Sequence, residues 1–363
     1  IAVELVGGTT FAGELQMKLL AAGKDVVTAN KALLAERGEE IFAAARKQGR
    51  CVAFEASCCG GIPVIGAIAT GLTANQISAM YGIVNGTCNY ILTGMSQEGK
   101  DYDTALREAQ AAGYAEADPT LDVSGADSAH KLAILAGLAF GKQIDYQKIP
   151  VQGIDGVQLA DIHYGCELGY TMKLLAIAED AAQGLSLRVH PSFISDNEPL
   201  AQVSGAYYAV SIFGDAVGHT SYFGRGAGMM PTASAVVADI IGVARGSAGQ
   251  IFRETPGLGR TAEPCRLCPT ADIMSKFYLR LSAIDKPGVF AQIAQVLGDH
   301  QIGISGCLQH ESESKEVVPV VIMTHLVRKG NLDQALNSLE KLEVIKAKPI
   351  CINVVTPPTG EPE

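Results

Sequence analysis

The segment from Gly113 to Lys131 combines carboxylates and a lysine in a pattern that could transfer protons. It contains Glu116, Asp122 and Asp127 and ends on Lys131. Asp127 and Lys131 are four residues apart, so on a helix they share one face. Apolar surroundings lower the pKa of a lysine, whereas neighbouring carboxylates raise it. A lysine balanced between these effects could exchange a proton with a substrate hydroxyl. An ordinary helix salt bridge, which is common and weak, is the alternative.

The helix that must position this pair is predicted to begin after Ser124. Ser124 is a suitable N-cap, and Asp127 falls in the first turn, where the helix dipole favours an anion. The residues that follow Lys131, from Leu132 to Phe140, are almost all apolar. We therefore expect a buried helix, with Lys131 at the border between the core and a carboxylate-lined cavity.

The first 55 residues predict a parallel, doubly wound sheet, because apolar runs alternate with helical segments over short connections. Strands are expected at 1–6, 25–30 and 50–55, with helices at 11–22 and 34–48. Ligands of such sheets bind beyond the carboxyl ends of the strands. The Gly7–Thr10 turn, Asn30–Lys31 and Glu55 follow the three strands, so they are predicted on one rim. The glycine turn could offer N–H groups to a ligand or be a plain turn.

The glycine-rich dinucleotide fingerprint, G-x-G-x-x-G after a strand, is not found in these first residues. Ile1–Val6 resembles a strand already in progress, so we expect the chain to begin in the middle of a domain. After Glu55, the small residues of 56–63 could turn backbone carbonyls toward a hard cation, or could form only a turn.

Composition narrows the class of protein. A chain of 363 residues with 48% hydrophobic and 18% charged residues has room for two or three globular domains. The net charge of −10 argues against nucleic acid or an anionic membrane surface as partner. Nine cysteines without a scaffold spacing suit a reducing compartment, so we expect a cytoplasmic protein.

Residues 276–355 predict a separate unit with the ferredoxin-like order strand, helix, strand, strand, helix, strand. Its strands are expected at 277–284, 303–310, 317–326 and 344–355, and its helices at 288–299 and 332–342. Residues 253–275 are expected to form a linker, in which Cys265 and Cys268 are too few ligands for zinc. Residues 356–363 are expected to be a disordered tail.

Several motifs together resemble the homoserine dehydrogenase family, of the kind that carries a C-terminal ACT domain. They are Val27–Lys31, Phe54–Ala56 with Gly60–Pro63, Gly82–Leu92, Gly113–Lys131, Gly224–Thr232 and, for the ACT domain, Asp285–Val289. The resemblance implies an α/β fold in three parts. These are a partial Rossmann-like parallel sheet (1–56, with a return helix at about 230–252), an α+β substrate-binding and dimerisation domain (57–229) and a ferredoxin-like ACT domain (276–355).

The resemblance also implies the reaction, which is the NAD- or NADP-dependent interconversion of L-homoserine and L-aspartate 4-semialdehyde. Lys131 matches the family's catalytic lysine and Asp127 its substrate-binding aspartate. Glu116 and Asp122 match further acids of the substrate pocket. Lys31 matches the lysine that contacts both cofactor and substrate and serves in catalysis.

Backbone positions and a cation site follow from the same resemblance. Close approach to the nicotinamide nucleotide is implied at Gly8, Thr9, Gly113 and Gly226. A sodium or potassium site is implied at Glu55 with the carbonyls of Cys58, Gly60 and Ile62. The family also implies a threonine effector at the ACT domain and assembly as a homodimer or homotetramer.

Two other interpretations remain open on the sequence. One is a non-catalytic, amino-acid-binding regulatory fragment, which the absent nucleotide fingerprint favours. The other is an aldehyde dehydrogenase that acts through Cys88 or Cys58, but no adjacent histidine supplies a base. Retention of Glu116, Asp127 and Lys131 favours the dehydrogenase.

Overall fold

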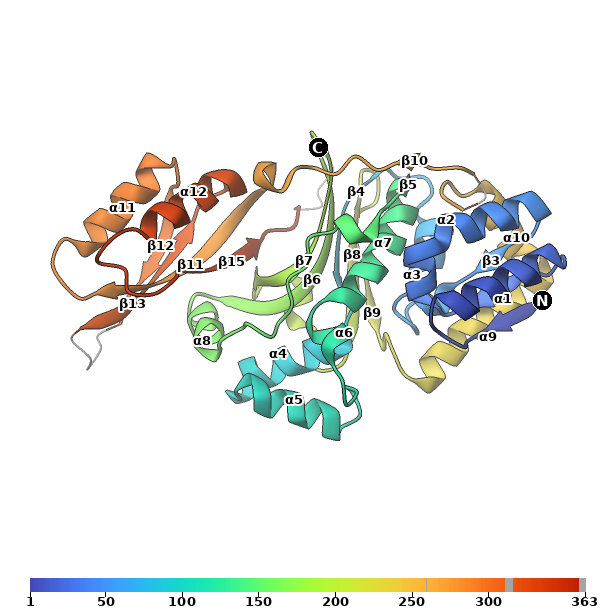
Figure 1. The fold of residues 1–363 in the computed structure, drawn as a ribbon, viewed down its shortest axis with the longest axis horizontal. Helices are drawn as coiled ribbons and strands as arrows, with labels where there is room; N and C mark the ends of the chain where they lie inside the picture. Colours follow the sequence, from blue (N-terminus) through green and yellow to red (C-terminus); the bar gives the residue numbers. More distant parts are fainter. Residues whose placement is uncertain (259, 311–315, 359–363) are drawn as a thin grey trace.

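The computed structural model describes residues 1–258, 260–310 and 316–358. The molecule is elongated, with the N-terminal layers at one end, the C-terminal unit at the other and a large sheet between them (Figure 1). The tail prediction for 359–363 lies outside the described residues.

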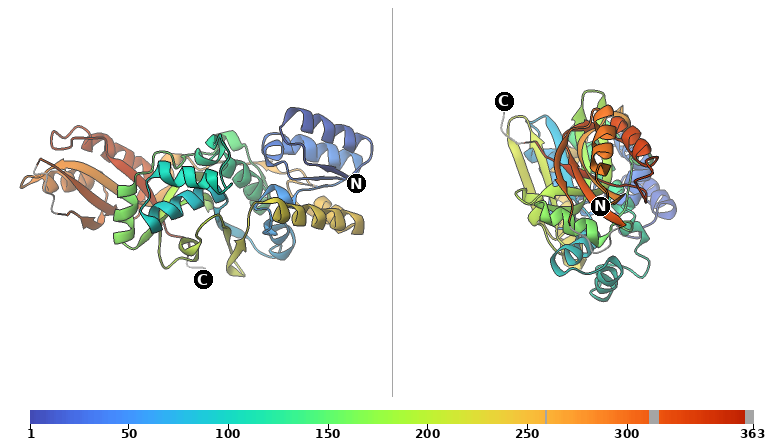
Figure 2. Two further views of the ribbon diagram at one scale, coloured as in Figure 1. Left: turned by 90° about the horizontal axis from the view of Figure 1, so that it is seen from below. Right: turned by 90° about the vertical axis from the view of Figure 1, so that its left-hand side faces the viewer.

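The N-terminal layers are built on a parallel sheet of three short strands, β1 (Ala2–Glu4), β2 (Val26–Thr28) and β3 (Val52–Ala53). Helices α1 (Thr10–Ala21) and α2 (Lys31–Gln48) lie on one face, and α9 (Met229–Arg245) with α10 (Ser247–Glu254) on the other (Figure 2). The predicted alternation is confirmed, although the strands are shorter than predicted. Where the sequence predicted one return helix at about 230–252, two helices, α9 and α10, cover the sheet. Helix α2 begins at Lys31, because the Asn30 side chain accepts a hydrogen bond from Leu33 N–H and caps it.

Glu4, the last residue of β1, carries a buried carboxylate that the sequence analysis did not single out. Glu4 is 1% exposed, and its Oε2 accepts hydrogen bonds from Gln16 Nε2 at 2.8 Å and Thr28 Oγ1 at 2.9 Å. Burial would raise the pKa of Glu4, but these bonds and two backbone N–H donors outweigh it and lower the pKa. Glu4 thereby ties β1, β2 and α1 together at the rim where the loops meet.

The middle of the molecule is an antiparallel sheet in the order β7-β6-β4-β8-β9. Its strands are β4 (Ile77–Ile83), β6 (Tyr170–Ala181), β7 (Gly184–Ser195), β8 (Tyr208–Gly214) and β9 (Gly218–Gly224). Three helices pack against β6, namely α4 (Gly86–Glu98), α7 (Ala126–Phe140) and α8 (Leu159–Glu167). Short helices α3 (Val64–Gly66) and α6 (Thr120–Val123) and helix α5 (Tyr102–Ala111) complete this part.

The C-terminal unit confirms the predicted ferredoxin-like order. Its sheet runs β12-β13-β11-β15. The elements are β11 (Met274–Ile284), α11 (Val289–Asp299), β12 (Ile304–Leu308), β13 (Val317–Thr324), β14 (Val327–Arg328), α12 (Lys329–Leu339) and β15 (Ile350–Val355). The last strand begins at Ile350 and not at Val344, because the segment before it contributes only one isolated bridge, between Ala283 and Ile345.

The C-terminal sheet continues into the middle sheet, which the sequence did not predict. Strand β15 pairs in parallel with β7, with Asn353 opposite Ser192. Asp161 of α8, 1% exposed, accepts hydrogen bonds across the junction from Tyr278 Oη at 2.9 Å and Arg280 Nε at 2.6 Å. A buried carboxylate is tolerated only when its charge and lone pairs are satisfied, so this junction is a fixed contact.

Exposed apolar side chains gather around the N-terminal layers, at Ile1, Val3, Leu5, Val6 and Phe11 near β1 and at Met229, Met230, Val237 and Ile241 on α9. Within the described ranges, no single helix is both long and apolar enough to cross a membrane. Helices α9 and α10 meet that test only as a pair, which is bent by 89°.

Candidate active site

The site is centred on a buried ion pair in the first turns of α7. Lys131 is 5% exposed, and its Nζ donates to Asp127 Oδ2 at 2.7 Å and to the carbonyl of Val84 at 2.7 Å. It also lies 3.4 Å from Tyr208 Oη and 4.9 Å from the centre of that ring. The predicted pairing of Asp127 with Lys131 is therefore present, and it is buried, unlike an ordinary surface salt bridge.

Lys31 reaches the same carboxylate from the N-terminal layers. Its Nζ lies 3.0 Å from Asp127 Oδ1, and its side chain is about one third exposed. Because Lys31 begins α2 at the carboxyl end of β2, the rim of the parallel sheet and the start of α7 meet at Asp127. The predicted rim is thus where the lysines converge.

Asn85 connects the acids and was missed by the sequence analysis. It is 3% exposed, and its Nδ2 donates to Asp127 Oδ2 and to Asp122 Oδ1, each at 2.8 Å. Its own Oδ1 accepts from Cys88 N–H at 2.9 Å, so Asn85 is also the N-cap of α4. An asparagine between an apolar strand and a helix start is the signal that could have identified it.

The electrostatics of the pair favour both charged forms. Burial alone would raise the pKa of Asp127, but Lys131 and Lys31 outweigh it and hold the pKa below its usual range. Burial alone would lower the pKa of Lys131, but Asp127 outweighs it and the pKa is raised. In the free protein Lys131 is therefore an ammonium.

The predicted N-cap of the helix that carries Asp127 and Lys131 is wrong. Helix α7 begins at Ala126, and its N-cap is Gly125, which adopts φ +86°. Ser124 instead ends the short helix α6. A side chain at 125 would lie 2.9 Å from Val151 Cγ1 and 3.3 Å from Val189 Cγ1, so tight packing requires glycine there.

A cavity of about 290 Å³ opens beside this cluster. Tyr208 and Gly113 line it, together with Thr87, Tyr114 and Arg225. Behind it, a Cβ at position 226 would lie 2.0 Å from the Tyr208 ring, and one at Gly60 would lie 2.6 Å from the carbonyl of Gly226. Backbone segments therefore approach the tyrosine closely, in a manner that only glycine permits.

The glycine turn after β1 lies on the same rim. Asn30 Nδ2 donates to the carbonyl of Gly8 at 2.7 Å, and Arg37 Nη1 donates to the carbonyl of Thr9 at 3.3 Å. Gly7 and Gly8 have φ of +80° and +73°, and no atom lies within 4 Å of a Cβ placed on either. The turn thus presents open backbone to a ligand.

The other predicted acids behave differently from one another. Asp122 joins the cluster through Asn85, whereas Glu116 is exposed on the loop and none of the described hydrogen bonds involves its carboxylate.

Cys88 is buried, its Sγ donates to the carbonyl of Asp122, and burial raises the pKa of its thiol well above the usual value. A thiol in that state is not an activated nucleophile.

Glu55, which was predicted to bind a cation, follows strand β3 and begins a short turn, Glu55–Ser57. Its carboxylate accepts hydrogen bonds from Ile65 N–H at 2.9 Å and Gly66 N–H at 2.8 Å, and its own N–H donates to Asp239 at 2.8 Å. Burial raises the pKa of Glu55 to about 7, and the neighbouring Asp239 charge adds to the shift. In the part of the chain that the structure describes, no cluster of three or more His, Cys, Asp or Glu residues could hold a metal ion.

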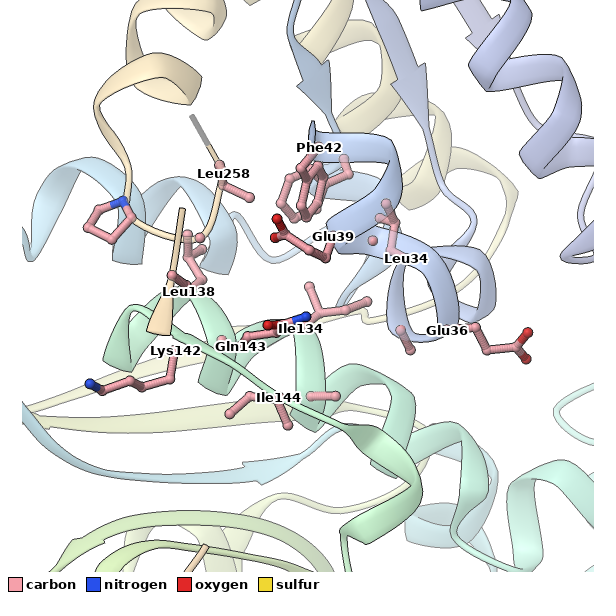
Figure 3. A pocket seen from close by; sticks show the side chains of 18 residues that line it. Leu34, Glu36, Glu39, Phe42, Ile134, Leu138, Lys142, Gln143, Ile144 and Leu258 are labelled. Carbon is pink, nitrogen blue, oxygen red and sulfur yellow. The ribbon is translucent and has the colours of Figure 1, made fainter. Parts of the chain in front are cut away.

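A second, smaller cavity of about 130 Å³ lies between α2 and α7 (Figure 3). Its walls include Phe42 of α2 and, on the part of α7 beyond the ion pair, Ile134 and Leu138. None of the predicted site residues is among its lining residues. The cavity beside Tyr208 is lined by Gly113 and by Tyr208, whose hydroxyl lies 3.4 Å from Lys131, although Lys131, Asp127 and Lys31 are not among its lining residues. Of these two cavities it is the better candidate for the substrate.

Comparison with known proteins agrees with these features. Residues 1–55 match the family model "Homoserine dehydrogenase, NAD binding domain", residues 63–241 match "Homoserine dehydrogenase" and residues 277–344 match "ACT domain". A homoserine dehydrogenase from Pseudomonas aeruginosa is 46% identical over 358 residues, which cover 98% of this chain and 82% of the relative.

Solved structures give the same result. The homoserine dehydrogenase of Thiobacillus denitrificans superposes with a TM-score of 0.91 at 44% identity, over 97% of this chain and 81% of that one. A hyperthermophilic archaeal homoserine dehydrogenase in complex with NADPH superposes with a TM-score of 0.58 at 28% identity, over 67% of this chain and 71% of that one.

The ion-pair geometry predicts an asymmetry between two substitutions. Asp127→Asn leaves the buried Lys131 without its carboxylate, which should lower the free energy of unfolding by about 3 to 5 kcal/mol. Lys131→Met leaves Asp127 paired with Lys31, so its cost should be smaller. Thermal denaturation at neutral pH measures both, with the exposed Asp155→Asn as control. Equal losses for both variants would contradict the central role of Asp127.

Proposed function

The chain belongs to the homoserine dehydrogenase family, and from this premise we propose that Lys131, Asp127 and Lys31 carry out its chemistry. The enzyme is an NAD(P)-dependent oxidoreductase that interconverts L-homoserine and L-aspartate 4-semialdehyde. The observation that carries the residue assignment is the buried Lys131 ammonium, 2.7 Å from Asp127 and 3.4 Å from Tyr208, which lines the cavity.

Lys131 acts on the substrate oxygen at C4. A nicotinamide held near Gly8, Thr9, Gly113 and Gly226 would supply the hydride acceptor for homoserine and the hydride donor for the aldehyde. In the direction of reduction, the Lys131 ammonium stabilises the developing alkoxide and donates the proton that completes the hydroxyl. In the direction of oxidation, the neutral amine takes that proton.

Asp127 keeps Lys131 protonated. Lys31 pairs with the same Asp127 carboxylate and so shares its negative charge with Lys131. The substrate is a zwitterion, so its ammonium is attracted to Asp122 and Asp127 and its carboxylate to Lys31. An ammonium beside Asp127 weakens the hold of that carboxylate on Lys131 and lowers the lysine's pKa. Substrate binding thereby favours the neutral Lys131 amine, which can then take up the proton of the substrate hydroxyl. Glu116, exposed in the free protein, is proposed to complete the substrate pocket.

The nucleotide is proposed to bind along the rim of the parallel sheet. Gly8 presents open backbone there and Thr9 follows it in the same turn, while Gly113 lines the cavity at Tyr208 and Gly226 lies against the Tyr208 ring. The three glycines favour close approach of a ligand because they carry no side chain.

Removing the Lys131 amine should abolish most turnover with little change in fold. Lys131→Met should lower kcat by about 10²- to 10⁴-fold, because the general acid–base group is lost. Steady-state assays of homoserine oxidation with NAD and NADP measure it. Lys148→Met, an exposed lysine in an ion pair with Asp145, is the matched control and should keep full activity. A kcat within about twofold of the unaltered enzyme would refute the role.

A sodium or potassium ion is proposed at Glu55 with the carbonyls of Cys58, Gly60 and Ile62. The support is the buried Glu55 carboxylate, for which only N–H donors are described and whose pKa is raised to about 7. A monovalent cation supplies the charge that this site lacks. Its role is to hold the loop that brings Gly60 against Gly226.

This site predicts cation stabilisation that grows with pH. A raised pKa means that, without cation, stability falls as pH rises from the usual value for Glu to about 7. Potassium chloride should therefore raise Tm over tetramethylammonium chloride by about 2 °C at about pH 8 and by much less at about pH 5.5. Glu55→Gln should remove the difference. If Glu55→Gln kept the same Tm difference between the two salts, the cation would have to bind elsewhere.

Threonine is proposed as the effector of the ACT domain. The support is the ACT match over 277–344 and its junction with the middle sheet through β15 and Asp161. L-threonine should lower homoserine oxidation and give a heat of binding in calorimetry, whereas D-threonine should do neither. Absence of both effects with L-threonine would reject threonine as the ligand.

The enzyme is proposed to act in the cytoplasm as a homodimer or homotetramer. All nine cysteines are free thiols, in keeping with a reducing compartment. The exposed Tyr207, Val217 and Phe223 on and around edge strand β9 offer apolar surface for a second copy.

A further inference from the structure

A cavity of about 260 Å³ lies at the junction between the middle sheet and the ACT domain. Strand β7 contributes Arg188 and His190, and the ACT domain contributes Phe277, Lys329 and Asn353. The connecting segment contributes Ile273. No acidic residue is among the residues that line this cavity. A pocket lined by both basic and apolar side chains is suited to an amphipathic anion.

The two cations that line the cavity differ in how firmly they are engaged. Arg188 is 6% exposed, and its Nη1 is held by Glu179 at 2.7 Å. Lys329 is half-buried, pairs with Asp333 on the next turn of α12 and lies 5.9 Å above the Phe277 ring. A flexible lysine on a helix surface exchanges carboxylate partners at little cost. Lys329 is therefore the cation that a ligand could recruit.

His190 adds an unsatisfied group to the cavity wall. It is 7% exposed, and burial, the largest influence, lowers its pKa to about 3, so the ring is neutral. Its Nδ1 lies 2.7 Å from Ser192 Oγ, but its Nε2 has no partner among the described residues. A buried polar atom without a hydrogen bond costs free energy, which a ligand that supplied the bond would recover.

We propose that the junction cavity binds a small aliphatic carboxylate of amino-acid size. The carboxylate is held by Lys329 and the Asn353 side-chain amide, and the aliphatic part packs on Ile273 and Phe277. Because the lining residues come from both the middle sheet and the ACT domain, a bound molecule contacts both parts at once.

The cavity wall is also the support of the catalytic helix. Val151 and Val189 line the cavity, and the same two side chains pack against Gly125, the N-cap of α7. Their backbones are joined by hydrogen bonds from Gln152 N–H to Val189 O at 2.8 Å and from Val189 N–H to Pro150 O at 2.9 Å. Helix α7 carries Asp127 and Lys131, so occupancy of the cavity bears on the ion pair and on turnover.

The inference deepens the proposed regulation and rests on it for the choice of L-threonine as first probe. Butyrate, which shares the carboxylate and aliphatic chain but lacks the ammonium, is the second probe. Inorganic phosphate tests for a general anion site. The class of ligand itself follows from the cavity and does not depend on threonine.

Paired substitutions on α12 test the site by calorimetry on the full-length enzyme. Lys329→Gln should weaken binding of L-threonine and butyrate about tenfold, a change of about 1.4 kcal/mol. Asp333→Asn, which frees Lys329 from its competitor, should preserve or strengthen binding. Lys341→Gln, an exposed lysine of the same domain, is the matched control and should change nothing. Melting temperatures of the variants verify that each is folded.

The outcomes separate this inference from the proposed function. Equal weakening by Lys329→Gln and Asp333→Asn would mean that the pair only supports α12, and it would overturn the site. Inhibition by threonine with binding unchanged in Lys329→Gln would leave the effector proposal standing and overturn this location. Butyrate binding that depends on Lys329, without threonine inhibition, would support the cavity and refute threonine. Phosphate binding as tight as butyrate would overturn the carboxylate class.

Discussion

The structure depends on one buried carboxylate, that of Asp127. Taking a carboxylate out of water costs several kcal/mol unless cations and donors surround it. Here Lys131 lies on the same helix, Lys31 comes from the end of β2, and Asn85 comes from the end of β4. Three segments that are distant in the chain must therefore converge on one side chain. Their convergence fixes how the parallel sheet, the middle sheet and α7 meet.

Local chemistry made part of this site readable from the sequence. Asp127 and Lys131 share a helix face because of their spacing, and Lys31 and Glu55 lie on the predicted rim because they follow parallel strands. The apolar run after Lys131 correctly indicated burial. In each case the deciding interaction lies within about one helical turn or at a strand end, where chain direction alone places the side chain.

The missed features are non-local. Gly125 is the N-cap of α7 because Val151 and Val189, distant in sequence, leave no space for a side chain. Tyr208 lies at the start of β8, close to Lys131, and the order of strands that brings it there cannot be read from the sequence. The pairing of β15 with β7 joins two segments that the sequence analysis assigned to separate domains. It could not be predicted, because the alternation of apolar and polar residues along a strand does not specify which strand lies beside it. Burial and the neighbouring carboxylate were expected to offset each other at Lys131. The pKa is raised instead, because the Asp127 carboxylate is as buried as the lysine itself.

The same ion pair explains why a non-catalytic reading fits the molecule poorly. A protein that only bound amino acids would gain nothing from holding an ammonium in its core beside a single carboxylate, since hydrophobic replacements of similar volume are often at least as stable. An enzyme gains a cation that is already oriented and desolvated when charge develops on the substrate oxygen. The free state stores Lys131 as an ammonium, ready for reduction of the aldehyde. In the mechanism that we propose, the incoming substrate ammonium competes for Asp127 before homoserine is oxidised, so that substrate binding and formation of the neutral amine are one electrostatic event.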